Sequence, residues 1–345
     1  MTPHATARRP IMWRGMHNGM ALRAVLLLAG ALLFGLLAAP LAVRAEGDGP
    51  ARVGTWKTAQ TIQPFLYAGL AAERLPPRGV EVLSFTNPGD QKAALLAGSL
   101  DMTGTTLALA IQAAARGEPV RLVAALCEKC SALVVRKGGG VTSVAGLRGG
   151  RVGYVPGTMH EILLREALTR AGLVPGRDVT LMRVDFFDMG IALAKGDIDA
   201  FLSGEPLPTQ AVLQGYGEIL AYPYFDDAIG PINAGLIVRT DTAEQRPDLV
   251  TALVAAHARA TERLRADKNL WLTEAATRFG TDRAVLDAAA PNMELAWDMD
   301  DAFVRRLAVL GARMKELGMI DREPDYAALV DRRFVDAVRA GLARP

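Results

Sequence analysis

The stretch that decides the fold is Ala132-Leu133-Val134-Val135-Arg136, which has a close counterpart in Gly235-Leu236-Ile237-Val238-Arg239 much later in the chain. Each is a short apolar run ending in arginine, as is typical of a buried strand. The first leads into Lys137-Gly138-Gly139-Gly140 and the second into Thr240-Asp241. We interpret the two runs as the strands by which the chain crosses between two lobes. Two core strands that resemble each other by chance are the alternative, because short apolar runs are common.

The remaining sequence alternates between strand-like and helix-like patterns. Residues 180–184 and 200–202 read as apolar strands, and residues 161–171 and 247–265 read as amphipathic helices. Such alternation is typical of α/β proteins with mainly parallel sheets flanked by helices. After Pro247 the pattern is almost wholly helical, which predicts a helical C-terminal tail. The predicted organisation is a discontinuous lobe I at 46–134 plus 236–345 and a lobe II at 135–235.

The first 45 residues have the layout of a signal peptide. They contain five arginines and no acidic residue, and they enclose an apolar run from Ala24 to Ala39. Val43-Arg44-Ala45 offers small or modest side chains where a signal peptidase acts, so we predict cleavage after Ala45. An uncleaved anchor is the alternative, although the apolar run is shorter than the roughly 20 residues that span a bilayer. The sequence therefore predicts a periplasmic protein.

Charge excludes two kinds of partner. Removing the five arginines of the export signal from the 39 basic residues leaves 34 against 37 acidic residues, so the mature chain is near −3. A weakly acidic chain without a tract of lysine and arginine lacks the electrostatic footprint of a protein that binds nucleic acid or an anionic membrane. The roughly 300 residues that remain are long enough to form two lobes.

Several motifs, in order and spacing, resemble the periplasmic substrate-binding proteins of the sulfonate, nitrate and taurine importers and the related binders of thiamine-pyrimidine precursors. The resemblance runs from about Val53 to Leu249. It is carried by residues 93–101 (AALLAGSLD), 114–120 (AARGEPV), 144–153 (VAGLRGGRVG), 163–173 and 192–200. It implies a type II periplasmic-binding fold, in which two α/β lobes close over a ligand by hinge motion. The implied partners are a small-molecule solute and the permease subunits of an ABC importer in the inner membrane, with the protein acting as a monomer.

The predicted ligand contacts follow the ends of strands, because ligands of open α/β sheets bind outside the carboxyl ends of the strands. Hydroxyls and free N–H groups at the start of a helix attract polar groups, and carboxylates favour an amine or a ring that donates hydrogen bonds over a bare oxyanion. The resemblance places contacts at the turn before residue 161 and at the position of Glu205. The candidates are Trp56, Thr105, Thr106, Thr158, Met159, His160, Asp185, Asp188 and Glu205. Core packing for Trp56 and helix capping for the threonines and aspartates are the structural alternatives.

The chain has two cysteines, Cys127 and Cys130, and they stand directly before the first crossing strand. In an oxidising compartment the plain expectation is a local disulfide. A soft-metal site for copper or zinc, completed by His160, Met159 or Met189, is the alternative. Redox catalysis is disfavoured, because a Cys-x-x-Cys that opens a helix is the redox motif and a strand follows here. The related family does not generally carry this pair.

The sequence thus predicts a binding protein without cofactor that captures a sulfonate-, amine- or pyrimidine-like molecule, and no enzyme. We find no Ser/His/Asp arrangement, phosphate loop or carboxylate pair. A soft-metal binding or delivery protein is one alternative. A second is an enzyme like the eukaryotic relatives that make the thiamine pyrimidine, which depend on a cysteine-rich iron site that this sequence lacks.

Overall fold

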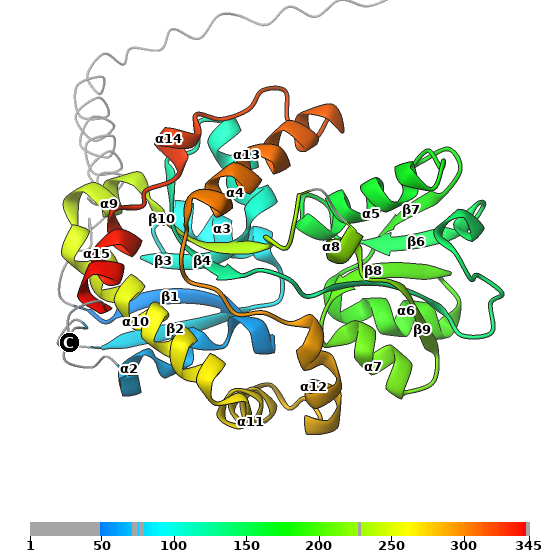
Figure 1. Cartoon of the computed structure of the whole chain (residues 1–345), viewed down its shortest axis with the longest axis horizontal. Helices are drawn as coiled ribbons and strands as arrows, with labels where there is room; N and C mark the ends of the chain where they lie inside the picture. Colours follow the sequence, from blue (N-terminus) through cyan, green and yellow to red (C-terminus); the bar gives the residue numbers. More distant parts are fainter. Residues whose placement is uncertain (1–48, 71–74, 76–78, 227–228, 343–345) are drawn as a thin grey trace, which may run out of the picture. The chain divides into compact units, whose positions relative to one another are not determined.

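The computed structural model describes residues 49–70, 75, 79–226 and 229–342. The predicted export signal and its cleavage after Ala45 lie outside the described residues. The chain from Pro50 onward forms one compact unit, and its strands form two five-stranded sheets, ordered β2-β1-β3-β10-β4 and β7-β6-β8-β5-β9 (Figure 1). The strands of the first sheet are β1 Ala51–Trp56, β2 Val80–Phe85, β3 Met102–Thr106, β4 Val120–Cys127 and β10 Ala234–Arg239. Those of the second are β5 Ser131–Arg136, β6 Arg151–Tyr154, β7 Thr180–Arg183, β8 Ala200–Gly204 and β9 Gly217–Ala221.

The two similar apolar runs occupy corresponding places in the two sheets. β5 lies between β8 and β9 and is antiparallel to both, and β10 lies between β3 and β4 and is antiparallel to both. The chain passes from the first sheet to the second between β4 and β5, and it returns between β9 and β10. Each of these strands belongs to the sheet that it enters, so it runs against the parallel strands already there.

The sheets are consequently mixed, whereas the alternating pattern predicted mainly parallel ones. β1 pairs in parallel with β2 and β3, and β6 pairs in parallel with β7 and β8. Right-handed crossovers through helices produce these parallel pairs. The antiparallel pairs all involve β5 or β10, the two strands that the chain forms on arriving from the other sheet.

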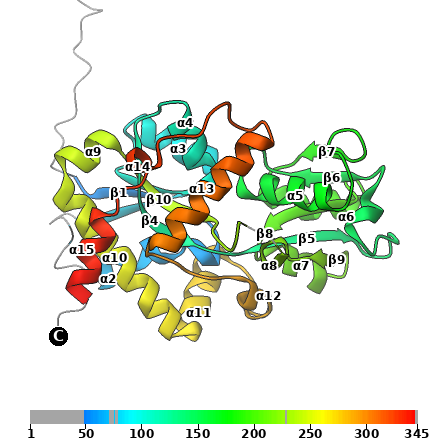
Figure 2. The same ribbon diagram turned by 45° about the horizontal axis from the view of Figure 1, so that its top comes forward.

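Helices cover the sheets, and both views show two groups of strands accompanied by their own helices (Figures 1 and 2). Most begin or end at recognisable signals: the Thr106 hydroxyl caps α4, Pro247 stands in the first turn of α10, and α11 ends at Gly280 with φ +66. The α-helices are α2 Tyr67–Leu70, α3 Pro88–Leu96, α4 Leu107–Ala115, α5 Met159–Arg170, α6 Met189–Lys195, α7 Leu207–Leu213, α8 Pro223–Asp226, α9 Thr240–Gln245, α10 Pro247–Ala266, α11 Lys268–Phe279, α12 Arg283–Ala289, α13 Asp301–Glu316, α14 Tyr326–Leu329 and α15 Arg333–Leu342. No helix in the described part of the chain combines the length and the apolar character that crossing a membrane requires.

The helical tail packs against the first sheet through α10. Val250, Leu253, Val254 and His257 repeat at the spacing of one helix face, and all four are fully buried. Each such aliphatic side chain stabilises the fold by about 2 kcal/mol through the burial of apolar area. Further along, α12 reaches across and packs against α7 of the second sheet.

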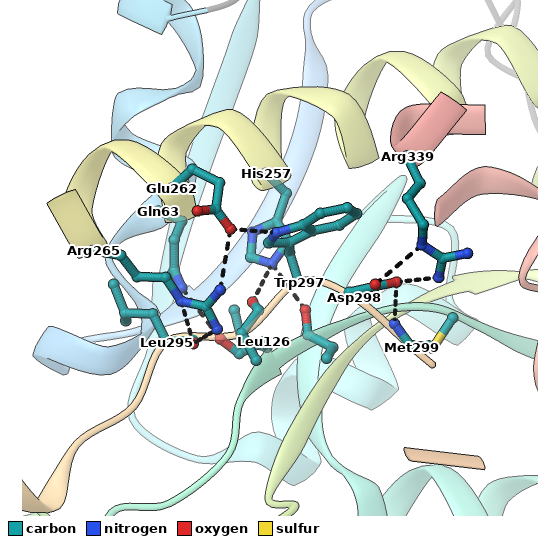
Figure 3. A network of polar contacts seen from close by, with 12 residues as sticks. Gln63, Leu126, His257, Glu262, Arg265, Leu295, Trp297, Asp298, Met299 and Arg339 are labelled. Carbon is teal, nitrogen blue, oxygen red and sulfur yellow. Dashed lines mark hydrogen bonds and ion pairs between the residues drawn. The ribbon is translucent and has the colours of Figure 1, made fainter. Parts of the chain in front are cut away.

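A polar network joins the tail to β4 (Figure 3). The backbone of residues 294–297 pairs with the end of β4, since the Ala125 N–H donates to Trp297 and the Ala296 N–H donates to Leu126. His257 Nε2 lies 2.9 Å from the Ala125 carbonyl oxygen and 3.0 Å from that of Ala296. The Trp297 indole donates to Glu262 over 2.7 Å. These contacts fix the strand end that carries Cys127.

Candidate functional site

A pocket with a cavity volume of about 60 Å³ lies where the strand ends of both sheets meet. The first sheet supplies residues from the ends of β1, β2, β3 and β4 and from the start of β10, and the second supplies residues from α5, the turn after β7 and the end of β8. This is where the general rule for α/β sheets places a ligand. The lining residues are Trp56, Thr58, Gln60, Thr61, Thr86, Pro88, Thr106, Cys127, Cys130, His160, Phe186, Phe187, Gly204, Glu205, Leu207, Asn233 and Ala234.

His160 stands in the first turn of α5 and is 5% exposed. Within the described part of the chain, neither nitrogen of its ring makes a well-aligned hydrogen bond, although the ring lies close enough to Cys130 to lower the pKa of that thiol. The ring meets Phe186 edge to face, with the ring centroids 5.1 Å apart. Gly204 makes room for it, because a Cβ there would lie 3.2 Å from His160 Nε2 and 3.3 Å from Cys130 Sγ. His160 and Cys130 therefore meet beside the same glycine.

Cys127 and Cys130 are free thiols, each 2% exposed, in contrast to the disulfide expected from their spacing. The Asn233 side-chain amide donates to both sulfurs, over 2.9 Å to Cys130 and 3.6 Å to Cys127. The Cys127 thiol is within hydrogen-bonding reach of Cys130 and keeps its proton, which with burial raises the pKa of Cys127 well above its usual value. That hydrogen bond, reinforced by His160, lowers the pKa of Cys130 to about 5 against the effect of burial. The pair is thus asymmetric, and Cys130 is the sulfur that loses its proton more readily.

Glu205 follows β8 and is 1% exposed. Its carboxylate accepts from the Thr209 backbone N–H over 3.1 Å and from the Asn292 side chain over 3.2 Å. Burial raises its pKa to about 7, although both hydrogen bonds oppose the shift. At neutral pH the carboxyl group is therefore held between its two protonation states and is ready to accept or donate a hydrogen bond.

The pocket is aromatic on one side and acidic on the other. Among the described residues that line it, none is an arginine or a lysine. Trp56, Phe186 and Phe187 provide ring faces and edges, whereas the Cys130 thiolate and Glu205 provide negative charge. A buried anion without a cationic partner is costly, so the site opposes a second anion and favours a cation or a neutral hydrogen-bond donor.

The sequence pattern of the family described as NMT1/THI5 like matches residues 79–269, which is more than half of the chain. The chain belongs to the NMT1/THI5-like family. In this NMT1/THI5-like protein the matched segment contains both chain crossings and most of the pocket. A curated relative, the 4-amino-5-hydroxymethyl-2-methylpyrimidine phosphate synthase of Schizosaccharomyces pombe, is 33% identical over 121 residues, which are 35% of this chain and 34% of that protein. The match thus spans about a third of that relative's length.

Solved structures show the same fold at low sequence identity. The ligand-binding component of an ABC-type import system from Staphylococcus aureus, with zinc bound, has a TM-score of 0.74 at 18% identity, covering 84% of this chain and 99% of that one. The alkanesulfonate-binding protein SsuA from Xanthomonas axonopodis pv. citri, bound to MOPS, has a TM-score of 0.73 at 20% identity, covering 84% and 100%. These likenesses confirm the type II periplasmic-binding fold that the motifs predicted.

The structure of this NMT1/THI5-like protein brings some of the predicted site residues together. Four of the nine predicted contacts line the pocket, and both cysteines join them. They are Trp56, Thr106, His160, Glu205, Cys127 and Cys130. Trp56 is the last residue of β1, and Thr106 ends β3 while capping α4, so both stand at the strand ends where we expected them.

The other five predicted contacts do not line the pocket. Thr158 is fully buried and its hydroxyl donates to the Val155 carbonyl over 2.8 Å. Met159 belongs to the core beneath α5, and Thr105 is buried inside β3. Asp185 and Asp188 are exposed, and neither side chain caps the helix that follows it. The aspartates flank Phe186 and Phe187, which do line the pocket.

Sequence reasoning missed several lining residues, of which Gln60 and Asn233 are the most informative. The Gln60 side chain donates to the Glu205 carbonyl oxygen over 2.9 Å, and so joins the loop after β1 to the second sheet. Asn233, directly before β10, serves both thiols. Asn233 stands just before a predicted crossing strand, and this position is the one feature of the sequence that could have indicated it as a lining residue. Among the residues that the structure describes, no three of His, Cys, Asp and Glu are placed to hold a metal ion.

Proposed function

We propose that this protein is the periplasmic solute-binding component of an ABC importer and that it captures a small organic molecule without converting it. The observation that carries the proposal is a buried pocket whose lining comes from the strand ends of both sheets. A ligand there touches both halves at once, so its binding energy favours the closed arrangement. Membership of the family and the fold shared with binding components of importers support the same function.

The two lobes of this proposal follow the sheets. The boundaries predicted at 134/135 and 235/236 fall inside β5 and β10, and each of these strands belongs wholly to one sheet. We therefore place the crossings in the short segments before them, at 128–130 and 222–233. The tail contributes to both lobes. It contacts the first sheet through His257, which lies beside the Ala125 carbonyl, and the second through Asn292, which donates to the Ser131 carbonyl over 3.3 Å and to Glu205.

The pocket favours a planar, neutral or cationic ligand such as an amine-bearing or pyrimidine-like ring. Trp56 and the two phenylalanines supply surfaces for stacking and cation–π contact. Glu205 can accept from a ring amine or donate to a ring nitrogen as its proton requires. A sulfonate would need a cation that the described lining does not contain. The soft-metal alternative is not favoured by the arrangement of His, Cys, Asp and Glu described above.

A thermal-shift titration of the mature protein tests this proposal with three probe classes: 4-aminopyrimidines, alkylamines and alkanesulfonates. A ligand at 100 times its Kd stabilises the folded state by about 2.7 kcal/mol, which raises Tm by about 5 °C in a chain of this size. We expect this rise with an aminopyrimidine or an amine and none with sulfonates. Small-angle scattering of the same sample is expected to show a smaller radius of gyration with ligand.

Matched variants locate the ligand. Trp56→Ala and Glu205→Gln are expected to abolish the ligand-dependent rise in Tm, whereas Thr158→Val and Asp188→Asn, which change residues outside the pocket, retain it. A rise that survives both pocket substitutions would refute this site. Stabilisation by sulfonates alone would refute the ligand class and leave the importer function standing.

Export is tested separately. Expression of the full chain with fractionation of the cell envelope is expected to place the protein in the periplasm, with a mature N-terminus at Glu46. Intact mass identifies the cleavage point. A full-length product retained in the membrane fraction would support the uncleaved anchor instead.

A further inference from the structure

The cysteine pair is an asymmetric dithiol built into the wall of the pocket. One amide, that of Asn233, donates to both sulfurs, and the shorter contact of 2.9 Å goes to Cys130. Hydrogen bonding between the two thiols raises the pKa of Cys127 and lowers that of Cys130. One sulfur is thus surrounded by donors, while the other is itself a donor. The pair lines the pocket in which we propose that a solute is captured, but its own chemistry requires no solute.

His160 gives a second, independent sign of chemistry at Cys130. Its ring is 95% buried and, within the described chain, neither nitrogen makes a well-aligned hydrogen bond, yet the ring lies close enough to Cys130 to lower the pKa of that thiol. An unpaired buried polar group costs about 1–3 kcal/mol, so its retention beside the sulfur calls for a functional reason. Both atoms converge on Gly204, where any side chain would crowd them.

We propose that Cys130 is a nucleophilic thiolate that reacts with small disulfides entering the pocket, and that Cys127 resolves the product into a Cys127–Cys130 disulfide. Activation comes from side chains and not from a helix N-terminus, which is why the Cys-x-x-Cys pattern before a strand did not predict it. The substrate must be a small molecule, because both sulfurs are 2% exposed and open only onto a cavity of about 60 Å³.

The exchange balances in two steps. The Cys130 thiolate attacks one sulfur of the disulfide, whose S–S bond breaks, and the other sulfur leaves as a thiolate. Cys127 then loses its proton and attacks Cys130 in the mixed disulfide, and the second ligand sulfur leaves as a thiolate. The Cys127 proton passes to one of the leaving thiolates. The small disulfide gains two electrons and becomes one thiol and one thiolate, which takes up a proton from water as its own pKa requires, and the cysteine pair is oxidised by the same two electrons.

The charged and titratable groups around Cys130 agree with these roles. His160 of α5 and the Cys127 thiol at the end of β4 favour the thiolate, whereas Glu205 at the end of β8 is coupled to it by repulsion. Glu128 raises the pKa of Cys127 slightly further. Lys129 pairs with Glu294 over 3.1 Å, so its charge is directed away from the pair. The thiolate at Cys130 and the thiol at Cys127 are therefore both favoured at neutral pH.

The test uses reduced, solute-free mature protein with cystamine as the small disulfide, and intact mass as the readout. Wild type is expected to end as an internal disulfide without an adduct. Cys127→Ser is expected to stop at a stable mixed disulfide on Cys130, and Cys130→Ser to form no adduct at a comparable rate. Asp188→Asn, which changes an exposed residue outside the pocket, serves as the matched control and should behave as wild type.

The pH profile separates an activated thiolate from an ordinary thiol. With a pKa of about 5, the Cys130 rate should be flat above about pH 6, whereas an ordinary thiol keeps accelerating up to about pH 8.5. The rate advantage at pH 6 is only about tenfold, because a thiolate of low pKa is also a weaker nucleophile. His160→Asn, which changes a positioning residue, is expected to move the profile toward higher pH.

Two results would overturn the proposal: adducts on both cysteines at equal rates, or a wild-type profile that rises through the range of an ordinary thiol. If a cysteine variant does not fold, peptide mapping of wild type quenched early in the reaction decides the same question, since the first adduct must be on Cys130. Because no solute is present, the result is independent of whether the importer function is correct.

Discussion

The two histidines of the described chain are both buried, yet their surroundings are opposite. His257 in α10 is fully buried, and its Nε2 lies between the carbonyl oxygens of Ala125 and Ala296 (Figure 3). It therefore carries its proton on Nε2, because both neighbours are acceptors. His160 in α5 is almost as buried but makes no well-aligned hydrogen bond at either nitrogen among the described residues. The first belongs to a structural network and the second faces a pocket.

The comparison shows that hydrogen-bond partners, and not burial or residue type, separate structural from functional polar groups. The same contrast holds for carboxylates. Asp298 in the network accepts from Arg339 and from the Met299 backbone N–H, whereas Glu205 in the pocket is buried with amide donors but without a cation. The network stabilises the fold. The pocket instead holds buried polar groups that lack full hydrogen bonding, and the free-energy cost of their burial is offset only when a ligand binds.

The largest expected difference between the two regions is in stability. His257→Leu removes the donor shared by two buried carbonyls and should lower the free energy of unfolding by about 3–4 kcal/mol. His160→Leu removes a buried polar group that makes no well-aligned hydrogen bond among the described residues, so we expect no loss of stability and a gain of up to about 1–3 kcal/mol. Urea denaturation of both variants measures the two values. Equal losses at the two positions would contradict the distinction.

The pH dependence of stability provides the next test, through Glu205. Its pKa is raised from 4.5 to about 7, so between these values the folded state binds a proton that the unfolded state has released. The stabilisation from this group is complete below pH 4.5 and is lost as pH rises through about 7. The shift corresponds to roughly 3 kcal/mol. The Glu205→Gln variant should not show this loss. Its Tm should therefore rise relative to that of the wild type as the pH is raised from about 5 to about 8.

A Tm difference between Glu205→Gln and wild type that stays constant over this range would contradict a raised pKa at this carboxyl group. Asp298→Asn serves as the control, because its carboxylate is paired with Arg339 and lies outside the pocket.

The fold was predictable because its signals are local and repeated. Alternating runs gave the strands and helices, and the two similar runs at 132–136 and 235–239 marked the strands that enter each sheet. Their antiparallel direction was not predictable from periodicity, because a buried strand has the same pattern in either direction. Thr105 and Thr106 were expected beyond the end of a strand, but both belong to strand β3.

The site was predictable to the level of strand ends but not of individual side chains. Thr158, Met159 and His160 are consecutive, yet only His160 faces the pocket, because successive residues at the start of a helix point about 100° apart. Asp185 and Asp188 similarly flank two residues that line the pocket, Phe186 and Phe187. Gln60 and Asn233 carry no motif, and their role depends on contacts with residues far away in sequence.

The smallest expected effect concerns the ion pair that closes the structural network. Arg339 of α15 donates to Asp298 over 2.5 Å and 3.1 Å, and the two side chains are 42% and 36% exposed. Solvent screens a pair of this kind, so Asp298→Asn should cost only about 1 kcal/mol, despite the two-point contact. Asp336→Asn breaks the neighbouring ion pair between Asp336 and Arg339, in which the Asp336 side chain is 50% exposed. This substitution should lower the free energy of unfolding by about 0.3 kcal/mol. Urea denaturation midpoints at low and high salt measure the loss of stability in each variant. An equal loss for both variants would mean that Asp298 contributes no more than a surface charge. The stabilising network around His257 would then extend only as far as Trp297.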